Sequence, residues 1–223
     1  MRGEDPKTVI NAAKLIQANE NLDGYLVFKT NQGTNDHLKN ELDSLELKPY
    51  TSGIVSGTVS SKPKIETGGH TFFSLTTKDY KINCAVYRPT KITSIALELA
   101  VGDKIRVGGS IRKASKKHNR TLNVEFIEIL KLSKQYKITN PSCNNCNKKM
   151  KSKGKNQGFE CIKCESKTDK KIKIELSRKI TQKLYVPAVT AHRHLTRPLE
   201  RLGRANYDTR ISKSIPWFHV FAK

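Results

Sequence analysis

The 223-residue sequence predicts an α+β, mostly β protein built from several small units rather than one large core. Three observations support this: an α/β pattern in residues 1–50, an alternating pattern of strands in residues 51–133, and two pairs of cysteines in residues 138–185. A basic tail, residues 186–223, completes the predicted organisation.

Residues 1–50 read as a partial α/β segment. Asp5 is a candidate N-cap with Pro6 at the first helical position, and apolar residues then recur at helical spacing. Residues 25–28 read as a short buried strand, and Asp36 is expected to cap a second helix with three leucines on one face. A piece of this size cannot cover its own sheet, so it needs a partner.

From residue 53 onward the hydrophobic period changes from helical to alternating. Strands are predicted at residues 54–59, 71–75, 80–87, 104–111 and 121–132, with an amphipathic helix at 90–100. Five strands with one helix between the third and the fourth is the element order of an OB-fold barrel. SH3-like barrels share most of this pattern but lack the helix.

An OB-fold binds oligonucleotides across its second and third strands and the loops beside them. Alternation places Phe72 and Phe73 on opposite faces of their strand, so one of the two belongs to the core. Cys84 reads as a small buried hydrophobe rather than a nucleophile. The candidate nucleic-acid contacts on the barrel are Phe72, Phe73, Tyr80, Tyr87, Arg88, Lys91, Arg112, Lys113, Lys116, Lys117 and Arg120.

Four of the five cysteines fall in two CxxC pairs, Cys143 with Cys146 and Cys161 with Cys164. This spacing is typical of a zinc ribbon, in which four thiolates surround one structural zinc ion and leave no open position for catalysis. An iron site could use the same ligands, but zinc is favoured. Four lysines beside these pairs are candidate phosphate contacts: Lys148, Lys149, Lys151 and Lys153.

The charge of the chain favours a polyanionic partner. The formal net charge is +22. Residues 134–223 include 22 basic and 6 acidic residues, so 22 − 6 = +16 of this charge lies in that part of the sequence. Arg193 and Arg197 in the tail are further candidate phosphate contacts. No window of the sequence has the apolar length of a membrane span, so we expect a cytoplasmic protein with no membrane partner.

The sequence shows no phosphate-binding Walker loop and no convergent pair of carboxylates, so no catalytic residues can be assigned. On the residues alone two binding functions stay open. One is a stand-alone OB-fold and zinc-ribbon protein that coats single-stranded nucleic acid, and the other is a translation-factor-like protein that docks on ribosomal RNA.

Motifs along nearly the whole chain resemble those of one family. They are RGE at residues 2–4, TNQGT at 30–34 with HL at 37–38, GGHTFF at 68–73, CAVYRPTK at 84–91, the double CxxC, and AHRHLTRPL at 191–199. In this order they resemble archaeal tRNA-Ile agmatinylcytidine synthetase. Two departures are an Asn inserted in the segment 34–36 and the residues after Lys91, where the family usually has an aromatic residue and an Arg.

The resemblance implies an ATP-dependent ligase that joins agmatine to the wobble cytidine of the isoleucine tRNA with a CAU anticodon. It implies the order ferredoxin-like domain, OB-fold, zinc ribbon, with residues 1–50 as the end of the ferredoxin-like domain. The family's kinase-like domain is missing from this sequence. We therefore expect the chain to be the tRNA-binding half of the ligase, with ATP and agmatine bound on a missing half or a partner chain.

Overall fold

The computed structural model describes residues 3, 5–17, 19–116, 119–202 and 218–220. The chain divides into two compact units, one made of Met1–Asp36 with His192–Lys223 and the other of His37–Ala191. In the described part of the chain, no helix is long and apolar enough to cross a membrane.

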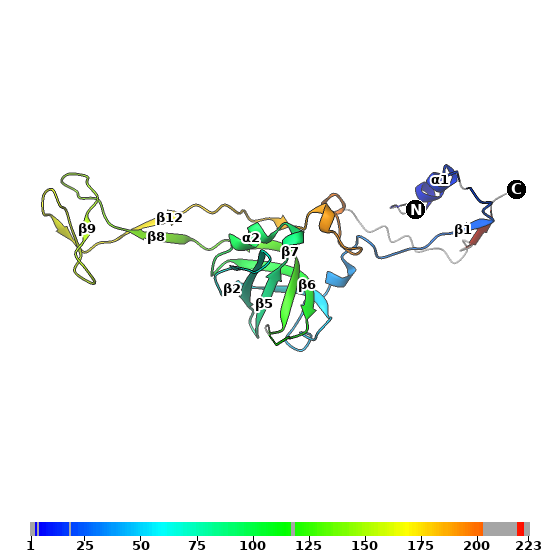
Figure 1. The fold of residues 1–223 in the computed structure, drawn as a ribbon, viewed down its shortest axis with the longest axis horizontal. Coiled ribbons are helices and arrows are strands. Elements are labelled where there is room, and N and C mark those ends of the chain that lie inside the picture. Colours follow the sequence, from blue (N-terminus) through cyan, green and yellow to red (C-terminus); the bar gives the residue numbers. More distant parts are fainter. Residues whose placement is uncertain (1–2, 4, 18, 117–118, 203–217, 221–223) are drawn as a thin grey trace. The chain divides into compact units, whose positions relative to one another are not determined.

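The first unit contains the helix and strand that the sequence predicts, but the strand is not buried as expected, because Leu26 is 42% exposed and Phe28 lies outside it and is 74% exposed. Helix α1 spans Pro6–Lys14, and the Asp5 carboxylate accepts a hydrogen bond from the Thr8 amide at 2.8 Å, as expected for an N-cap. Strand β1, Gly24–Leu26, pairs antiparallel with strand β14, Phe218–Val220, near the end of the chain (Figure 1). The β1 strand thus obtains a partner from the chain's own tail.

A second link within this unit joins the loop of residues 30–35 to the segment 192–202. The Gly33 amide donates to the carbonyl of His194, and the Asn35 amide donates to the carbonyl of Leu195, both at 2.9 Å. The Arg201 guanidinium donates to the carbonyl of Gly33 at 3.1 Å, from a short 3-10 turn at Leu199–Arg201. Two sequence motifs more than 150 residues apart therefore form one local structure.

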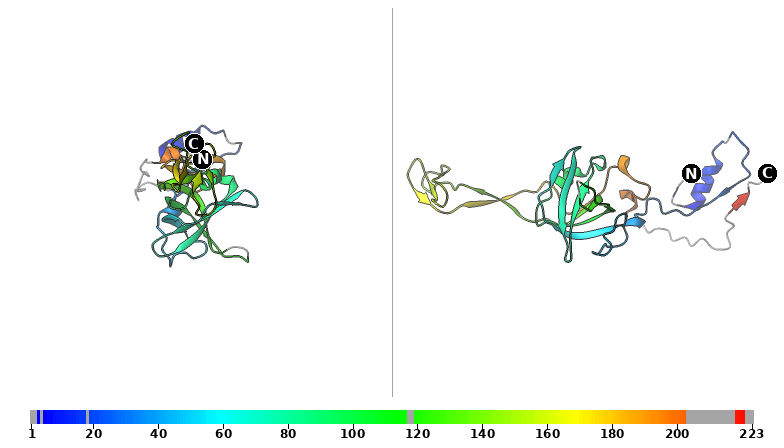
Figure 2. Two further views of the ribbon diagram at one scale, coloured as in Figure 1. Left: turned by 90° about the vertical axis from the view of Figure 1, so that its left-hand side faces the viewer. Right: turned by 60° about the horizontal axis from the view of Figure 1, so that its bottom comes forward.

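The second unit is centred on a closed barrel, as predicted (Figures 1 and 2). Its five strands are β2 Ser52–Val59, β4 His70–Thr76, β5 Lys81–Val86, β6 Lys104–Arg112 and β7 Thr121–Lys131. Neighbouring strands are antiparallel in the order β5, β4, β2, β6, β7, and a parallel pairing of β5 with β7 closes the ring. A short helix, α2 at Thr93–Leu97, follows the 3-10 turn Arg88–Thr90 and joins the third barrel strand to the fourth. This confirms the OB-fold order.

The barrel interior is filled by one side of each strand. The largest fully buried side chains include Leu75, Ile105, Ile111, Leu122 and Ile127. Burial of each of these side chains contributes about 1.5–3 kcal/mol to stability. Among the described residues, the barrel holds the larger of the two apolar clusters, and the other lies around the cysteines. Cys84 is fully buried in the barrel cluster, and its burial raises the pKa of the thiol, which makes it unreactive as expected.

Two glycines allow the barrel to close tightly on β6. A side chain on Gly108 would overlap the Phe126 ring, and one on Gly109 would overlap the Asn123 carbonyl. Opposite this pair the register of β7 shifts, so that Glu125 forms a β-bulge. The Glu125 carboxylate is thereby aimed at His37, whose Nε2 lies 3.0 Å away.

The prediction of a second helix beginning at Asp36 is wrong. Only a 3-10 turn forms, Asp36–Leu38, and the chain then runs irregularly to β2. The Asp43 carboxylate accepts the amides of Leu45 and Glu46, a local arrangement that competes with a helix. Leu38 and Leu42 are still buried, but Leu45 is 78% exposed.

Other elements differ in length from the expectation. Strand β3, Lys64–Glu66, is an additional strand that forms a hairpin with β4. The helix predicted at 90–100 is limited to α2 and the preceding 3-10 turn.

The cysteine-rich segment is carried on two paired strands. Strand β8, Gln135–Thr139, leads into it, and strand β12, Ile172–Leu176, leads out, with an antiparallel pairing between them. Between these strands lies a small three-stranded sheet of β9 Lys151–Ser152, β10 Phe159–Glu160 and β11 Lys167–Thr168. The chain then returns to the barrel, where β13, Leu184–Tyr185, pairs with β7, and a 3-10 turn follows at Val189–Ala191.

A buried ion pair attaches both ends of the segment from β8 to β12 to the barrel. Asp103 is fully buried, and its two carboxylate oxygens accept hydrogen bonds from Arg178 at 2.9 and 2.7 Å. Arg178 also donates to the carbonyl of Ser133, just before β8, and to that of Glu98. The segments entering and leaving the paired strands are thus tied to the same turn.

Candidate metal centre and nucleic-acid interface

Two equivalent turns of the backbone position the four cysteines. The Asn147 amide donates to the carbonyl of Cys143 at 2.8 Å, and the Glu165 amide donates to that of Cys161 at 2.8 Å. Asn147 and Glu165 both have positive φ angles, 52° and 56°. Each CxxC pair therefore forms a knuckle that turns its two sulfurs to the same side.

The sulfurs of the four cysteines lie within 4.8 Å of one another. The distance between Cys143 and Cys164 Sγ is 3.3 Å, that between Cys146 and Cys161 is 3.2 Å, and that between Cys146 and Cys164 is 3.7 Å. Bonds of about 2.3 Å to a tetrahedral zinc ion require sulfur separations of about 3.8 Å. The donor set and its spacing therefore fit a structural zinc ion with four thiolate ligands.

The apolar core around the cysteines is small. Besides Cys143 and Cys161, only Met150 and Phe159 are buried in its cluster. Such a core is too small to offset the entropy of folding on its own. A bound zinc ion would cross-link the two knuckles and supply the missing stabilisation.

Exposed lysines surround the cysteine centre, as the sequence predicts. Lys148, Lys149 and Lys151 are exposed, and they have no ion-pair partner among the described residues. Lys153 differs because its Nζ lies 2.6 Å from the Glu160 carboxylate. The hydrogen bond from Lys153 holds the pKa of Glu160 below its usual value. The first three lysines are the freer cations for an anionic partner.

The barrel separates the predicted aromatic contacts into two groups. Phe73 is 3% exposed and belongs to the core, so its assignment to the interface is wrong, whereas Phe72 is half-buried on the opposite side of β4. Tyr80 is also structural, because its hydroxyl donates to the carbonyl of Leu42 at 2.5 Å and its ring packs on the core. Burial and nearby acidic groups raise the pKa of Tyr80 to about 12.

Tyr87 lies in a cluster of cationic and aromatic side chains at the end of β5. Its ring meets the His70 ring edge-on, with centroids 4.8 Å apart, and its hydroxyl accepts a hydrogen bond from Arg112 at 3.3 Å. Arg88 is exposed next to it, and Lys91 is exposed with a positive φ of 59°. An aromatic ring with cations at its edge is suited to stacking a base and contacting its phosphate.

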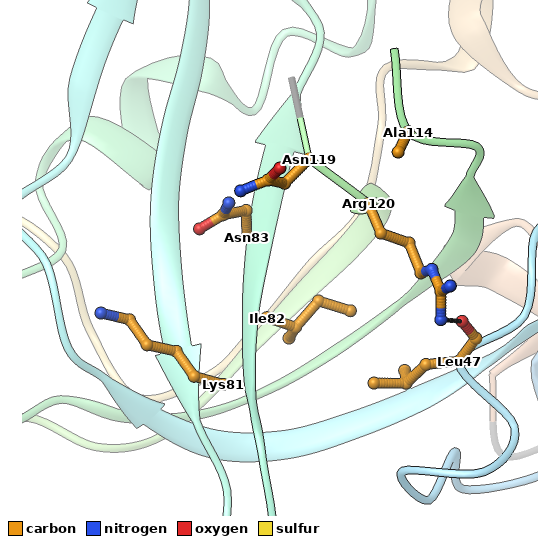
Figure 3. Close-up of a pocket in the computed structure, with 7 residues that line it drawn as sticks. All are labelled: Leu47, Lys81, Ile82, Asn83, Ala114, Asn119 and Arg120. Carbon is orange, nitrogen blue, oxygen red and sulfur yellow. Dashed lines mark hydrogen bonds between the residues drawn. The ribbon is translucent and has the colours of Figure 1, made fainter. Parts of the chain in front are cut away.

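The loop between β6 and β7 contributes the remaining barrel candidates. Lys113 and Lys116 are exposed, and the Arg120 guanidinium donates to the carbonyl of Leu47 at 2.5 Å. Lys117 lies outside the described residues. Between this loop and β5 is an open groove of about 610 Å³, and Figure 3 shows its lining side chains.

Sequence reasoning missed three polar residues of that groove, Lys81, Asn83 and Asn119. The signal was present for the first two: in β5 the exposed residues Lys81 and Asn83 alternate with the buried Ile82 and Cys84. Neither residue has an aromatic ring to stack a base, so the predicted stacking surface did not include them.

The candidates in the tail belong to the other unit. Arg193 is exposed, and its amide donates to the Thr196 hydroxyl. The Arg197 amide donates to the Asn35 side chain at 2.7 Å, and its Nε donates to the carbonyl of Arg201. Arg197 is thus partly occupied in linking the two motif segments of this unit. The part of the tail from 203 to 217 and from 221 to 223 lies outside the described residues.

An OB-fold barrel joined to a four-cysteine ribbon, both with exposed basic residues, is an arrangement typical of nucleic-acid-binding modules. The family model of the TiaS C-terminal zinc ribbon domain matches residues 140–180, and that of the TiaS FLD domain matches residues 1–37.

Curated relatives agree with both models. The chain is 39% identical to TiaS of Cenarchaeum symbiosum, a 2-agmatinylcytidine synthetase of isoleucine tRNA, over 99% of this chain and 49% of that protein. It is 40% identical to TiaS of Methanosarcina mazei over 92% of this chain and 46% of that protein. The chain is thus a relative of the TiaS proteins, and it spans about half the length of the curated relatives that it matches.

Solved structures show the same relation. The structure of TiaS in complex with isoleucine tRNA, AMPCPP and agmatine matches 90% of this chain and 45% of the TiaS chain, with a TM-score of 0.68 and 30% identity. The structure of apo TiaS matches 90% of this chain and 47% of that chain, with a TM-score of 0.67 and 33% identity.

Proposed function

We propose that this chain is the tRNA-binding half of an ATP-dependent ligase that conjugates agmatine to the wobble cytidine of the isoleucine tRNA with a CAU anticodon. The observation that carries the proposal is the match to TiaS over nearly the whole chain, including proteins crystallised with isoleucine tRNA, a nucleotide and agmatine. We assign the RNA contacts to the OB-fold of residues 51–133 and the ribbon of residues 138–185.

Zinc has a structural role in this proposal. Cys143, Cys146, Cys161 and Cys164 hold one ion, which fixes the two knuckles and the lysines beside them. With four thiolates bound, the ion offers no position for water or substrate and supplies no chemistry to the ligation.

The ATP-dependent step is assigned to a partner chain with a kinase-like domain. Phosphoryl transfer needs a phosphate cradle and metal-holding carboxylates, and the described residues of this chain bring together no such group. Two of the acidic residues, Asp5 and Asp103, have structural roles: Asp5 caps α1, and Asp103 binds Arg178.

The binding half of the proposal is tested by competition at matched salt. Isoleucine tRNA should bind more tightly than poly-dT, and its affinity should fall with salt with a log–log slope of about −0.7 to −0.9 for each phosphate contact. Equal competition by poly-dT would contradict the proposal and favour a protein that coats single strands.

A further inference from the structure

The open groove between β5 and the loop residues Ala114, Asn119 and Arg120 has walls of two different kinds (Figure 3). Asn83 and Asn119 lie side by side on one wall, with Lys81 on the same side. Arg120 and Leu47 form the opposite wall, held together by the hydrogen bond from the guanidinium to the Leu47 carbonyl.

A hydrogen bond fixes which end of the Asn83 amide faces the groove. The hydroxyl of Ser74, a residue that is 9% exposed, donates to Asn83 Oδ1 at 2.9 Å. The Ser74 amide in turn donates to the Ser61 hydroxyl at 2.8 Å, so the serine is itself held in place. This bond holds the Asn83 oxygen toward Ser74 and leaves the NH₂ group, which has no hydrogen-bond partner among the described residues, as the donor available to a ligand.

The apolar part of the groove is formed by residues of the core. Ile82 is 4% exposed and Leu47 is 9% exposed, so both present only a small fixed surface. Apolar surface beside paired amides suits a nucleobase, because RNA-binding proteins read unpaired bases by amide contacts to the base edges. The Lys81 ammonium and the Arg120 guanidinium are placed to meet the phosphates on either side.

We propose that this groove binds one unpaired nucleotide of an RNA, with Asn83 and Asn119 contacting the edge of its base. This inference rests on the proposed function and adds a base-reading site to it. The amide groups give the barrel sequence preference, whereas the lysines beside the cysteine centre give affinity without sequence preference.

The test compares RNA decamers of uridine, cytidine and adenosine with isoleucine tRNA, using the full chain and two variants. Asn83→Asp keeps the oxygen that accepts from Ser74 but replaces the NH₂ donor with an acceptor. Asn119→Ala removes the second amide but keeps the backbone carbonyl, which accepts from the Thr121 hydroxyl. The matched control is Lys104→Gln, at an exposed position of β6 outside the groove, which changes the net charge by the same amount as Asn83→Asp.

The wild-type chain and the control should distinguish the best from the worst decamer by about tenfold or more, as expected for one good amide pair with a base. Both groove variants should reduce this ratio to about twofold while the salt slope of tRNA binding stays the same. The inference is overturned if the wild-type chain binds the decamers equally or not at all, or if the variants keep its preference. A wild-type chain that binds isoleucine tRNA no better than poly-dT would instead refute the proposed function, so the two failures are distinguishable.

Discussion

At the residue scale, Asp103 is the buried charge that joins the barrel to the ribbon segment. It accepts hydrogen bonds from Arg178, from the Ser133 amide and hydroxyl, and from the Ala100 amide. Its side chain is fully buried, whereas that of Arg178 is 14% exposed. A buried carboxylate of this kind is stable only while its partners are present.

Replacing Arg178 with Met should therefore lower the free energy of unfolding of the barrel by about 3–5 kcal/mol, because Asp103 is left buried and unpaired. Lys179→Met is the matched control. Its ammonium is 3.6 Å from Glu98, but its side chain is 81% exposed, and such surface pairs contribute about 0–1 kcal/mol. Urea unfolding of both variants measures the difference, and equal losses would show that the buried pair has no special role.

The Asp103 carboxylate should also make the stability of the fold depend on pH. Burial alone would raise the pKa of Asp103, but the hydrogen bonds from Arg178, Ala100 and Ser133 outweigh burial and hold the pKa below 3.8. The folded-state pKa is thus lower than that of the unfolded chain. The stabilisation is present above about pH 4 and is lost as the pH falls through the folded-state pKa.

Unfolding free energies measured between pH 6 and pH 2 should show this loss. In Asp103→Asn the contribution is absent at every pH, so its curve should fall less steeply below about pH 4 than that of the wild-type chain. Parallel curves for the two proteins would contradict the assignment of this titration to Asp103.

Asn35 explains a departure of the sequence from its family motif. Its φ is 58°, in the left-handed region that Asn tolerates better than most residues, and its side chain accepts the Arg197 amide at 2.7 Å. Asn35→Gly should keep the backbone conformation but lose this hydrogen bond, whereas Asn35→Ala should lose both. Amide hydrogen exchange at Gly33 and at the Arg197 amide should accelerate in the order wild type, Gly, Ala; equal rates in all three would contradict the link.

At the element scale, the ribbon is expected to depend on its metal. A chelator should remove one zinc ion per chain and abolish the dispersed NMR signals of residues 141–168, while those of the barrel persist. Cys161→Ser should have the same effect, and Cys84→Ala, at the buried non-ligand cysteine, should keep the zinc. An apo-protein with a folded ribbon would contradict the inference that zinc supplies the stability missing from the small Met150 and Phe159 core.

The elements that the sequence predicted well are those with a strong local pattern. Alternation of buried and exposed residues located the five barrel strands, and the CxxC spacing located the cysteine cluster. The helix expected from Asp36 does not form: an irregular segment buries Leu38 and Leu42 but leaves Leu45 exposed, and the Asp43 carboxylate accepts backbone amides locally. Pairing of β1 with β14 was not foreseen because it joins segments almost 200 residues apart.

The candidate interface was predictable only in part, for a related reason. Sequence alternation showed that one of Phe72 and Phe73 is buried but could not say which. The structural role of Tyr80 could not be predicted, because it depends on a hydrogen bond to the Leu42 carbonyl, 38 residues away in the sequence. The burial of Asp103 could not be predicted either, because its partner Arg178 lies 75 residues further along the chain.

At the scale of the whole molecule, the proposed function assigns tRNA binding to this chain and catalysis to a second chain. The chain carries a formal charge of +22, which favours a polyanionic partner, and its four-cysteine site suits a structural ion with no open coordination position. The account therefore predicts a half-enzyme that binds tRNA but needs a second chain for ATP chemistry.

The most direct test is mass spectrometry of isoleucine tRNA after incubation with ATP, agmatine and the purified chain, with and without a chain carrying the kinase-like domain. The account predicts unmodified wobble cytidine with this chain alone and agmatinylcytidine when both chains are present. Formation of agmatinylcytidine by this chain alone, lost on mutation of one of its own acidic residues, would contradict the account.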